Sequence, residues 1–376
     1  MQKWNIKTLK ELRKKYKILV DKEVDISKQL EYTSILGSID AILCRYNELS
    51  IGIDIQSHPK LDETLKSDED LISYHSDYMP ILREFNFVRD KIFVHPNTLF
   101  DILPFSKNNL FNTSDNFYES VGSVFLDRYL ELIKYRKDNL YIRKSASVNV
   151  YGLTYCVYGK NISFIELGLT HTVQDYVTLI HEYGHAIGNS INAYATWDSS
   201  KYVLLELPSI FFEILGTMFV GDNLDLEDDS YNLILGELTD YLLATRRIIT
   251  KLDMYGDVGF ESLLDKSFYK KYASKELGLE SKDIKDLMYI PISEDFHYII
   301  SYLTAIELVL IYKSDKKEAL RLLNLILIDN EKSPNDYLKY IRSLGIFPGK
   351  NIDAYLELVS QKGKEIKSNN LVLKKH

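Results

Sequence analysis

The pentapeptide His181-Glu182-Tyr183-Gly184-His185 constrains the fold of this chain more than any other segment. Two histidines four residues apart share one face of a helix, with Cβ atoms about 5–6 Å apart. Two imidazoles placed in this way can bind one tetrahedral metal ion, and Glu182 then lies beside the metal, where it can deprotonate a water molecule. The motif therefore predicts a helix and indicates a zinc site with Glu182 as the general base.

The sequence around the motif supports the helix. Val173, Val177 and Ile180 recur at helical spacing before it, and Gly188-Asn189 after it is typical of a helix end. The alternative interpretation is a pair of surface histidines on an amphipathic helix. A zinc hydrolase needs a third protein ligand and an open fourth position. Whether a further ligand follows the motif therefore decides between a zinc site and surface histidines.

Glu206 is the candidate third ligand. It lies in the apolar segment Tyr202–Val220, whose length would suit a membrane span. Because a carboxylate at the centre of a membrane costs several kcal/mol, the glutamates in this segment favour a buried helix of a folded protein instead. A bound cation would compensate a buried Glu206, and the alternative is a salt bridge at the helix start.

Glu213 follows Glu206 by two helical turns and shares its face. We expect it to accept a hydrogen bond from a ligating imidazole, a usual way to orient a metal-bound histidine. A purely structural role is the alternative.

Helical periodicity also dominates the rest of the chain. It runs from Trp4 to about Ser50, from about Asp115 to Tyr135, and from residue 172 to the end, whereas residues 55–80 suit a loop or short helices. Between about 140 and 170 the chain is rich in β-branched and aromatic residues separated by glycines, which predicts a small sheet. The predicted fold is mainly α, with a small β-sheet that precedes the HExxH helix.

Composition and charge limit which classes of binding partner we expect. The net charge is −8, from 46 basic and 54 acidic side chains, and no long basic stripe is present, so nucleic acid is not an expected partner. Cys44 and Cys156 form no CxxC pair, which leaves a disulfide framework or a cysteine zinc site unsupported. The N-terminal residues are not an apolar signal segment, so we expect a cytoplasmic protein with no membrane partner. The oligomeric state is left open.

Three segments resemble the thimet oligopeptidase and oligoendopeptidase F family of zinc peptidases, over roughly residues 140 to 350. SFIELGLTHTVQDYVTLIHEYGHAIG resembles the family's strand, loop and HExGH helix, and Glu206-Leu207-Pro208-Ser209 followed by Glu213 resembles its ExPSxxxE helix. FHYIISYLTAIELVLIY resembles, less closely, the helix that bears the family's tyrosines. The resemblance implies a helical zincin-type fold with a substrate cleft.

The resemblance also assigns roles. It implies that His181, His185 and Glu206 bind one zinc ion per chain. Tyr302, and also Tyr298, would donate hydrogen bonds to the tetrahedral intermediate.

Two features depart from the family pattern: the chain is shorter than typical members, and Ile292 stands where a histidine usually precedes the tyrosine helix. The nearby His297 is the candidate substitute, and the alternative is an ordinary packed or surface histidine.

These assignments predict a zinc endopeptidase that hydrolyses short or extended peptides. Residues 1–138 would form a helical region walling the cleft, and residues 139–376 the catalytic region. The resemblance further implies that peptide substrate pairs with the strand Ile162–Leu169. Two alternatives stay open: a dedicated processing protease for one partner peptide, and a zinc-containing protein that binds peptides without turnover.

Overall fold

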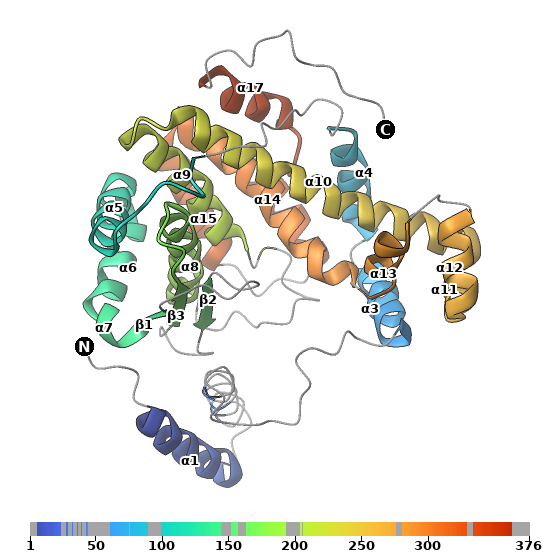
Figure 1. Ribbon diagram of the computed structural model, residues 1–376, viewed down its shortest axis with the longest axis horizontal. Coiled ribbons are helices and arrows are strands. Elements are labelled where there is room, and N and C mark those ends of the chain that lie inside the picture. The colour runs from blue at the N-terminus through green and yellow to red at the C-terminus, as the bar shows by residue number, and fades with distance from the viewer. Residues whose placement is uncertain are drawn as a thin grey trace.

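The computed structural model confirms a mainly helical chain with one small sheet. Coiled ribbons surround three short strands in Figure 1. The described residues are 6–23, 61–74, 76–88, 99–143, 152–156, 163–192, 206–275, 280–289, 291–328 and 334–362, with a few single residues between them.

Short helices precede the sheet. They are α1 (Ile6–Lys22), α3 (Leu61–Tyr74), the 3-10 helix η1 (Ser76–Tyr78), α4 (Met79–Asn86), α5 (Lys107–Val121), α6 (Ser123–Lys134) and α7 (Arg136–Asn139). In Figure 1, α5, α6 and α7 lie on one side of the molecule and α3 lies on the other. Residues 61–74 and 76–80 are helical, which favours short helices over a loop there, while Cys44 and about half of the helical stretch predicted from Trp4 to Ser50 lie outside the described residues.

The helix predicted from about Asp115 to Tyr135 is instead two helices, α5 and α6. Gly122 has φ 66° and Ser123 has φ 59°, which are left-handed backbone conformations that end one helix and redirect the chain into the next. A glycine adopts this conformation at no steric cost, and the hydrophobic period continues across the break, so periodicity alone does not reveal it.

The sheet lies where the sequence predicts it. Its strands are β1 (Leu140–Arg143), β2 (Gly152–Cys156) and β3 (Ser163–Gly168), in the order β1-β3-β2. Strand β1 pairs with β3 in parallel and β2 pairs with β3 antiparallel, with Thr154 opposite Ile165. The helix α8 (Gln174–Ile191) packs against β2 and β3.

This strand order corrects the prediction that Ile162–Leu169 pairs with substrate. Strand β3 occupies most of that range and is central, so β1 and β2 already bond to both of its edges. A substrate strand needs unpaired backbone groups, and among the described strands β1 and β2 are the edge strands.

Ten helices, among them the longest of the described residues, follow the sheet and supply most of the core. They are α8, α9 (Leu207–Asn223), α10 (Glu227–Val258), α11 (Phe260–Leu263), α12 (Lys266–Lys275), α13 (Ser281–Tyr289), α14 (Ile292–Ser314), α15 (Lys316–Ile328), α16 (Pro334–Ser343) and α17 (Ile352–Lys362). Helix α9 packs against α8, α10 and α14, and α10 extends across most of the described core (Figure 1).

Of the apolar segment Tyr202–Val220, the part from Leu207 onward lies in α9 and is a buried helix, as predicted, while residues 202, 203 and 205 lie outside the described residues. Another helix, α14, is long and apolar enough over Asp295–Ser314 to cross a membrane, but 67% of the segment is buried inside the protein. Burial to this extent is typical of a helix in the core of a folded protein, so α14 is read as a core helix.

Candidate metal centre

The turn between β3 and α8 fixes where the motif helix begins. The buried carboxylate of Asp175 accepts hydrogen bonds from the backbone N–H groups of Thr170, at 2.7 Å, and His171, at 2.9 Å. Val177 and Ile180 are fully buried on the inner face of α8, as their spacing predicts. The helix continues past the predicted stop at Gly188-Asn189 and ends at Ile191.

Helices α8 and α9 touch through their backbones beside the motif. A Cβ atom on Gly184 would lie 2.4 Å from the Cα atom of Ser209 and 2.8 Å from its backbone nitrogen. No side chain fits at that distance, so the contact requires glycine. Because Gly184 adjoins His185 and Ser209 is three residues after Glu206, this crossing brings the third candidate ligand to the two histidines.

The three candidate ligands meet at one point. The Oε2 atom of Glu206 lies 3.4 Å from Nε2 of His181 and 3.0 Å from Nε2 of His185, and the ligand atoms all lie within 4.8 Å of one another. Zinc bonds of about 2.0–2.1 Å in a tetrahedron separate two ligand atoms by about 3.3 Å. Two imidazoles and a carboxylate at these distances could hold a metal ion.

The carboxylate and the imidazoles of this cluster shift one another's pKa values. Burial raises the pKa of Glu206, but the charges and hydrogen bonds of His185 and His181 outweigh it and hold that pKa well below its ordinary value. Burial lowers the pKa of His181, and Glu213 together with Glu206 outweighs it and raises that pKa well above its ordinary value. The site therefore favours positive charge next to Glu206, which a metal cation would also provide.

Behind the cluster, a second layer of carboxyl groups orients His181. Oε2 of Glu213 lies 2.5 Å from Nδ1 of His181, which leaves Nε2 directed at Glu206. This is the contact that the sequence predicts for Glu213. Glu237 of α10 lies near Glu213 in turn, and burial together with the charge of Glu213 raises the pKa of Glu237 well above its ordinary value.

The candidate base, Glu182, lies on α8 with only 6% of its surface exposed. Its Oε2 atom accepts a hydrogen bond from the hydroxyl of Thr154 on β2, at 2.6 Å. Sequence reasoning missed both Thr154 and Glu237. The only local signal was Gly152, since a glycine within a strand often marks the close approach of another chain segment.

The structure places the two candidate tyrosines in different surroundings. Tyr298 is 37% exposed, and burial together with the nearby charge of Glu206 raises the pKa of its hydroxyl above the ordinary value. Tyr302 is fully buried and its ring stacks on Tyr241, with centroids 4.1 Å apart. The hydroxyl of Tyr302 lies near that of Tyr355 and makes no hydrogen bond of ordinary geometry with the described residues.

His297 is half-buried one residue before Tyr298. Its Nδ1 donates a hydrogen bond to the backbone carbonyl of Ser293, at 2.7 Å, and its ring lies 4.6 Å from that of Tyr298. Among the described contacts, none joins His297 to the three candidate ligands, whereas Tyr298 lies near Glu206.

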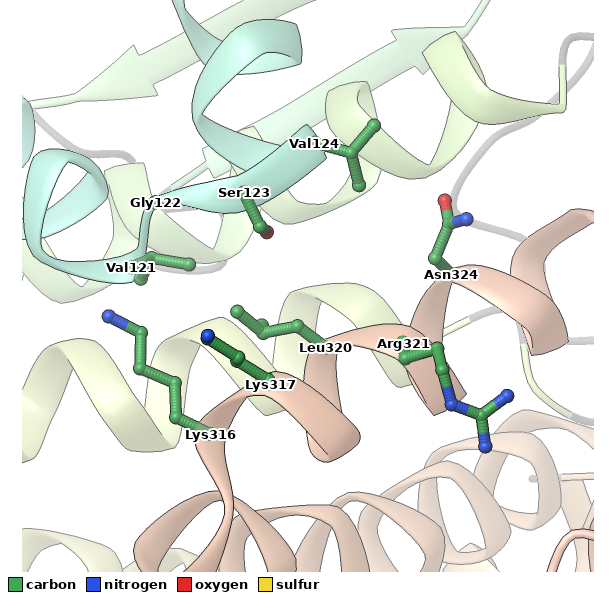
Figure 2. A pocket seen from close by; sticks show the side chains of 9 residues that line it. All are labelled: Val121, Gly122, Ser123, Val124, Lys316, Lys317, Leu320, Arg321 and Asn324. Atoms are coloured by element: carbon green, nitrogen blue, oxygen red, sulfur yellow. The ribbon is translucent and has the colours of Figure 1, made fainter.

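A cavity of about 540 Å³ lies away from this cluster. Figure 2 shows the start of α6 on one wall and α15 on the other, with the basic side chains of α15 at the rim. It is lined by Val121, Gly122, Ser123, Val124, Lys316, Lys317, Leu320, Arg321 and Asn324. None of these is a candidate site residue, so this cavity is not the predicted substrate cleft.

No protein-family model and no curated protein matches the sequence. Four solved structures match the fold, and two of them have TM-scores above 0.5. A candidate oligoendopeptidase F is 12% identical with a TM-score of 0.51, over 91% of this chain and 66% of its own. A candidate peptidase from Chlamydophila abortus is 13% identical with a TM-score of 0.52, over 95% of this chain and 62% of its own. The chain thus spans somewhat less than two thirds of these structures, and over that span it has their helical fold.

Proposed function

We propose that this chain is a zinc-dependent oligopeptidase that hydrolyses short or extended peptides. The observation that carries the proposal is the convergence of His181, His185 and Glu206, with the charge of Glu182 close enough to act on His181. The fold shared with two candidate peptidases supports it. A general base next to three ligands of a Lewis-acidic metal is the arrangement that metal-assisted hydrolysis requires.

In the proposed hydrolysis, the zinc ion and the side chains have different roles. Zinc held by His181, His185 and Glu206 would supply Lewis acidity toward a carbonyl oxygen and toward water. Glu182 accepts the proton of the attacking water and passes it to the leaving amine. The hydroxyl of Tyr298 donates a hydrogen bond to the substrate carbonyl oxygen as negative charge develops there.

The edge strand β2 is the better-placed strand for substrate. Its inner edge pairs with β3, and the side chain of Thr154 reaches Glu182. An extended peptide added beside β2 would gain affinity from main-chain hydrogen bonds, which tolerate many side chains. This mode supports an enzyme that acts on varied peptides.

The test is a mixed peptide library incubated with purified protein and read by mass spectrometry. The parental protein should contain about one zinc per chain by elemental analysis, and a chelator should abolish cleavage. Glu206→Ala removes one of three protein ligands and should lose both zinc and activity. Glu182→Gln keeps the shape of the side chain but not the proton acceptor, so zinc should stay while turnover falls by orders of magnitude.

Glu318→Gln is the matched control, because Glu318 pairs with Arg321 on the surface of α15. It should leave zinc and cleavage unchanged. Zinc retention without cleavage of any peptide by the parental protein would contradict a peptidase and favour a peptide-binding protein. Cleavage confined to one peptide of the library would favour a dedicated processing protease.

A further inference from the structure

The strand β2 contacts the carboxylate of Glu182 through two successive residues of one face. Thr154 is 9% exposed, and its hydroxyl lies 2.6 Å from Oε2 of Glu182 and 3.0 Å from the backbone oxygen of Glu182. A hydroxyl has a single proton, and the carboxylate at the shorter distance is the stronger acceptor. The hydrogen bond therefore runs from Thr154 to the Glu182 side chain.

Gly152 contacts the other oxygen of the same carboxylate. A Cβ atom built on Gly152 would lie 2.5 Å from Oε1 of Glu182 and 2.7 Å from Cγ2 of Thr178. Residues 152 and 154 point to the same face of the strand, because side chains alternate with a period of two. Any larger residue at 152 would push the Glu182 carboxylate away from β2.

The strand that makes these contacts is itself held in place. All five residues of β2 pair with β3, from Gly152 opposite Leu167 to Cys156 opposite Ser163. β3 is central in the sheet and packs on α8, the helix that carries Glu182. A hydroxyl on such a strand has a defined position relative to the helix, as positioning groups on regular elements do.

We propose that Thr154 is a positioning residue for Glu182. Its hydroxyl holds Oε2 while Gly152 lies against Oε1, and the two contacts fix the orientation of the carboxylate that accepts the proton. The glutamate side chain has three rotatable bonds, and proton transfer requires a donor–acceptor distance of about 2.6–3.2 Å. A displacement of about 1 Å in a reacting group can cost as much as a hundredfold in rate. This role rests on the proposed function, because it gives Glu182 the part of the general base.

Two variants separate a positioning role from simple packing. Thr154→Val keeps the shape of the side chain and removes the hydroxyl, whereas Thr154→Ser keeps the hydroxyl and removes a methyl group. With zinc saturating, we expect Thr154→Val to lower kcat about ten- to a hundredfold with KM nearly unchanged, and Thr154→Ser to retain most of the parental kcat. Packing alone would make the two variants similar, or would lower thermal stability without changing kcat in the folded protein.

Thr217 provides the matched control. It is fully buried on α9, and its hydroxyl makes no hydrogen bond with the residues that the structure describes. Thr217→Val should leave kcat unchanged. In a Glu182→Gln background, Thr154→Val should cause no further loss, because the positioned carboxylate is already gone.

Crystal structures of the parental protein and both Thr154 variants provide a readout that does not depend on activity. The Glu182 carboxylate should leave its parental position in Thr154→Val and keep it in Thr154→Ser. A carboxylate that stays in place in both variants, or a parental kcat in Thr154→Val, would overturn the inference. Absence of cleavage by the parental protein would instead overturn the proposed function, and the crystal structures would still decide whether Thr154 positions Glu182.

Discussion

The crossing of α8 and α9 and the helix α14 supply the candidate site in different ways. At the crossing, the backbones touch at Gly184 and Ser209, and the ligands His185 and Glu206 lie within three residues of that contact. Helix α14 brings Tyr298 to the cluster from a point six residues after its start at Ile292. A direct contact between backbones positions the crossing of α8 and α9. The position of Tyr298 depends instead on the contacts that fix the start of α14.

The start of α14 is held by a buried charged cluster. The carboxylate of Asp68, on α3, accepts a hydrogen bond from the backbone N–H of Ile292 at 2.6 Å. Lys251 and the hydroxyl of Tyr255, both on α10, bond to the other oxygen of Asp68 at 2.8 and 2.5 Å. Both Asp68 and Lys251 are almost completely buried. Elements distant in sequence thus set the position of α14, and no local pattern encodes that position.

The largest effect is expected from a substitution at Gly184, where α8 and α9 touch. In Gly184→Ala the new methyl group would overlap the backbone of α9, so the helices must separate. Overpacking costs about 1–3 kcal/mol, and here the obstacle is backbone that cannot rotate away. We expect a fall in thermal stability and in zinc per chain, measured by thermal denaturation and elemental analysis.

Gly236, in the interior of α10, is the control for this prediction. A Cβ atom there would meet nothing within 4 Å. Gly236→Ala should stabilise the protein by about 1 kcal/mol, the usual gain from replacing a helical glycine. If Gly184→Ala kept the parental melting temperature and zinc content, the contact between α8 and α9 would not set the ligand spacing.

The two regions also differ in how far the sequence predicts them. The helix at HExxH and the contact of Glu213 with His181 depend on helical spacing, which periodicity describes well. Thr154 and Glu237 reach the site only because β2 and α10 dock beside it, so neither carries a local signal. The order of the strands likewise depends on pairing between distant segments, and the sequence therefore located the sheet but not its edge strand.

Tyr298→Phe tests whether the tyrosine that α14 places near Glu206 serves the reaction. The substitution removes only the hydroxyl that lies near Glu206. We expect kcat to fall about tenfold, the effect of a catalytic hydrogen bond worth about 1.4 kcal/mol, while KM changes little. Steady-state kinetics at saturating zinc measure the effect.

Tyr289, near the end of α13, controls for the loss of a tyrosine hydroxyl in general. Tyr289→Phe should turn over at the parental rate. Equal rates for the parental protein and Tyr298→Phe would mean that Tyr298 does not serve the reaction. His297, one residue earlier on α14, would then be tested by His297→Ala.

The smallest effect is expected at Tyr302, four residues beyond Tyr298 on the same helix. Its hydroxyl faces that of Tyr355, yet neither makes a hydrogen bond of ordinary geometry with any described residue. Replacing a buried, unsatisfied hydroxyl with hydrogen costs little and can stabilise a protein. Tyr302→Phe should therefore keep the parental kcat and zinc content, with an unchanged or slightly higher melting temperature. A tenfold loss of kcat without loss of stability would show that Tyr302 reaches the reaction, as the sequence resemblance implied, and that α14 changes position when substrate binds.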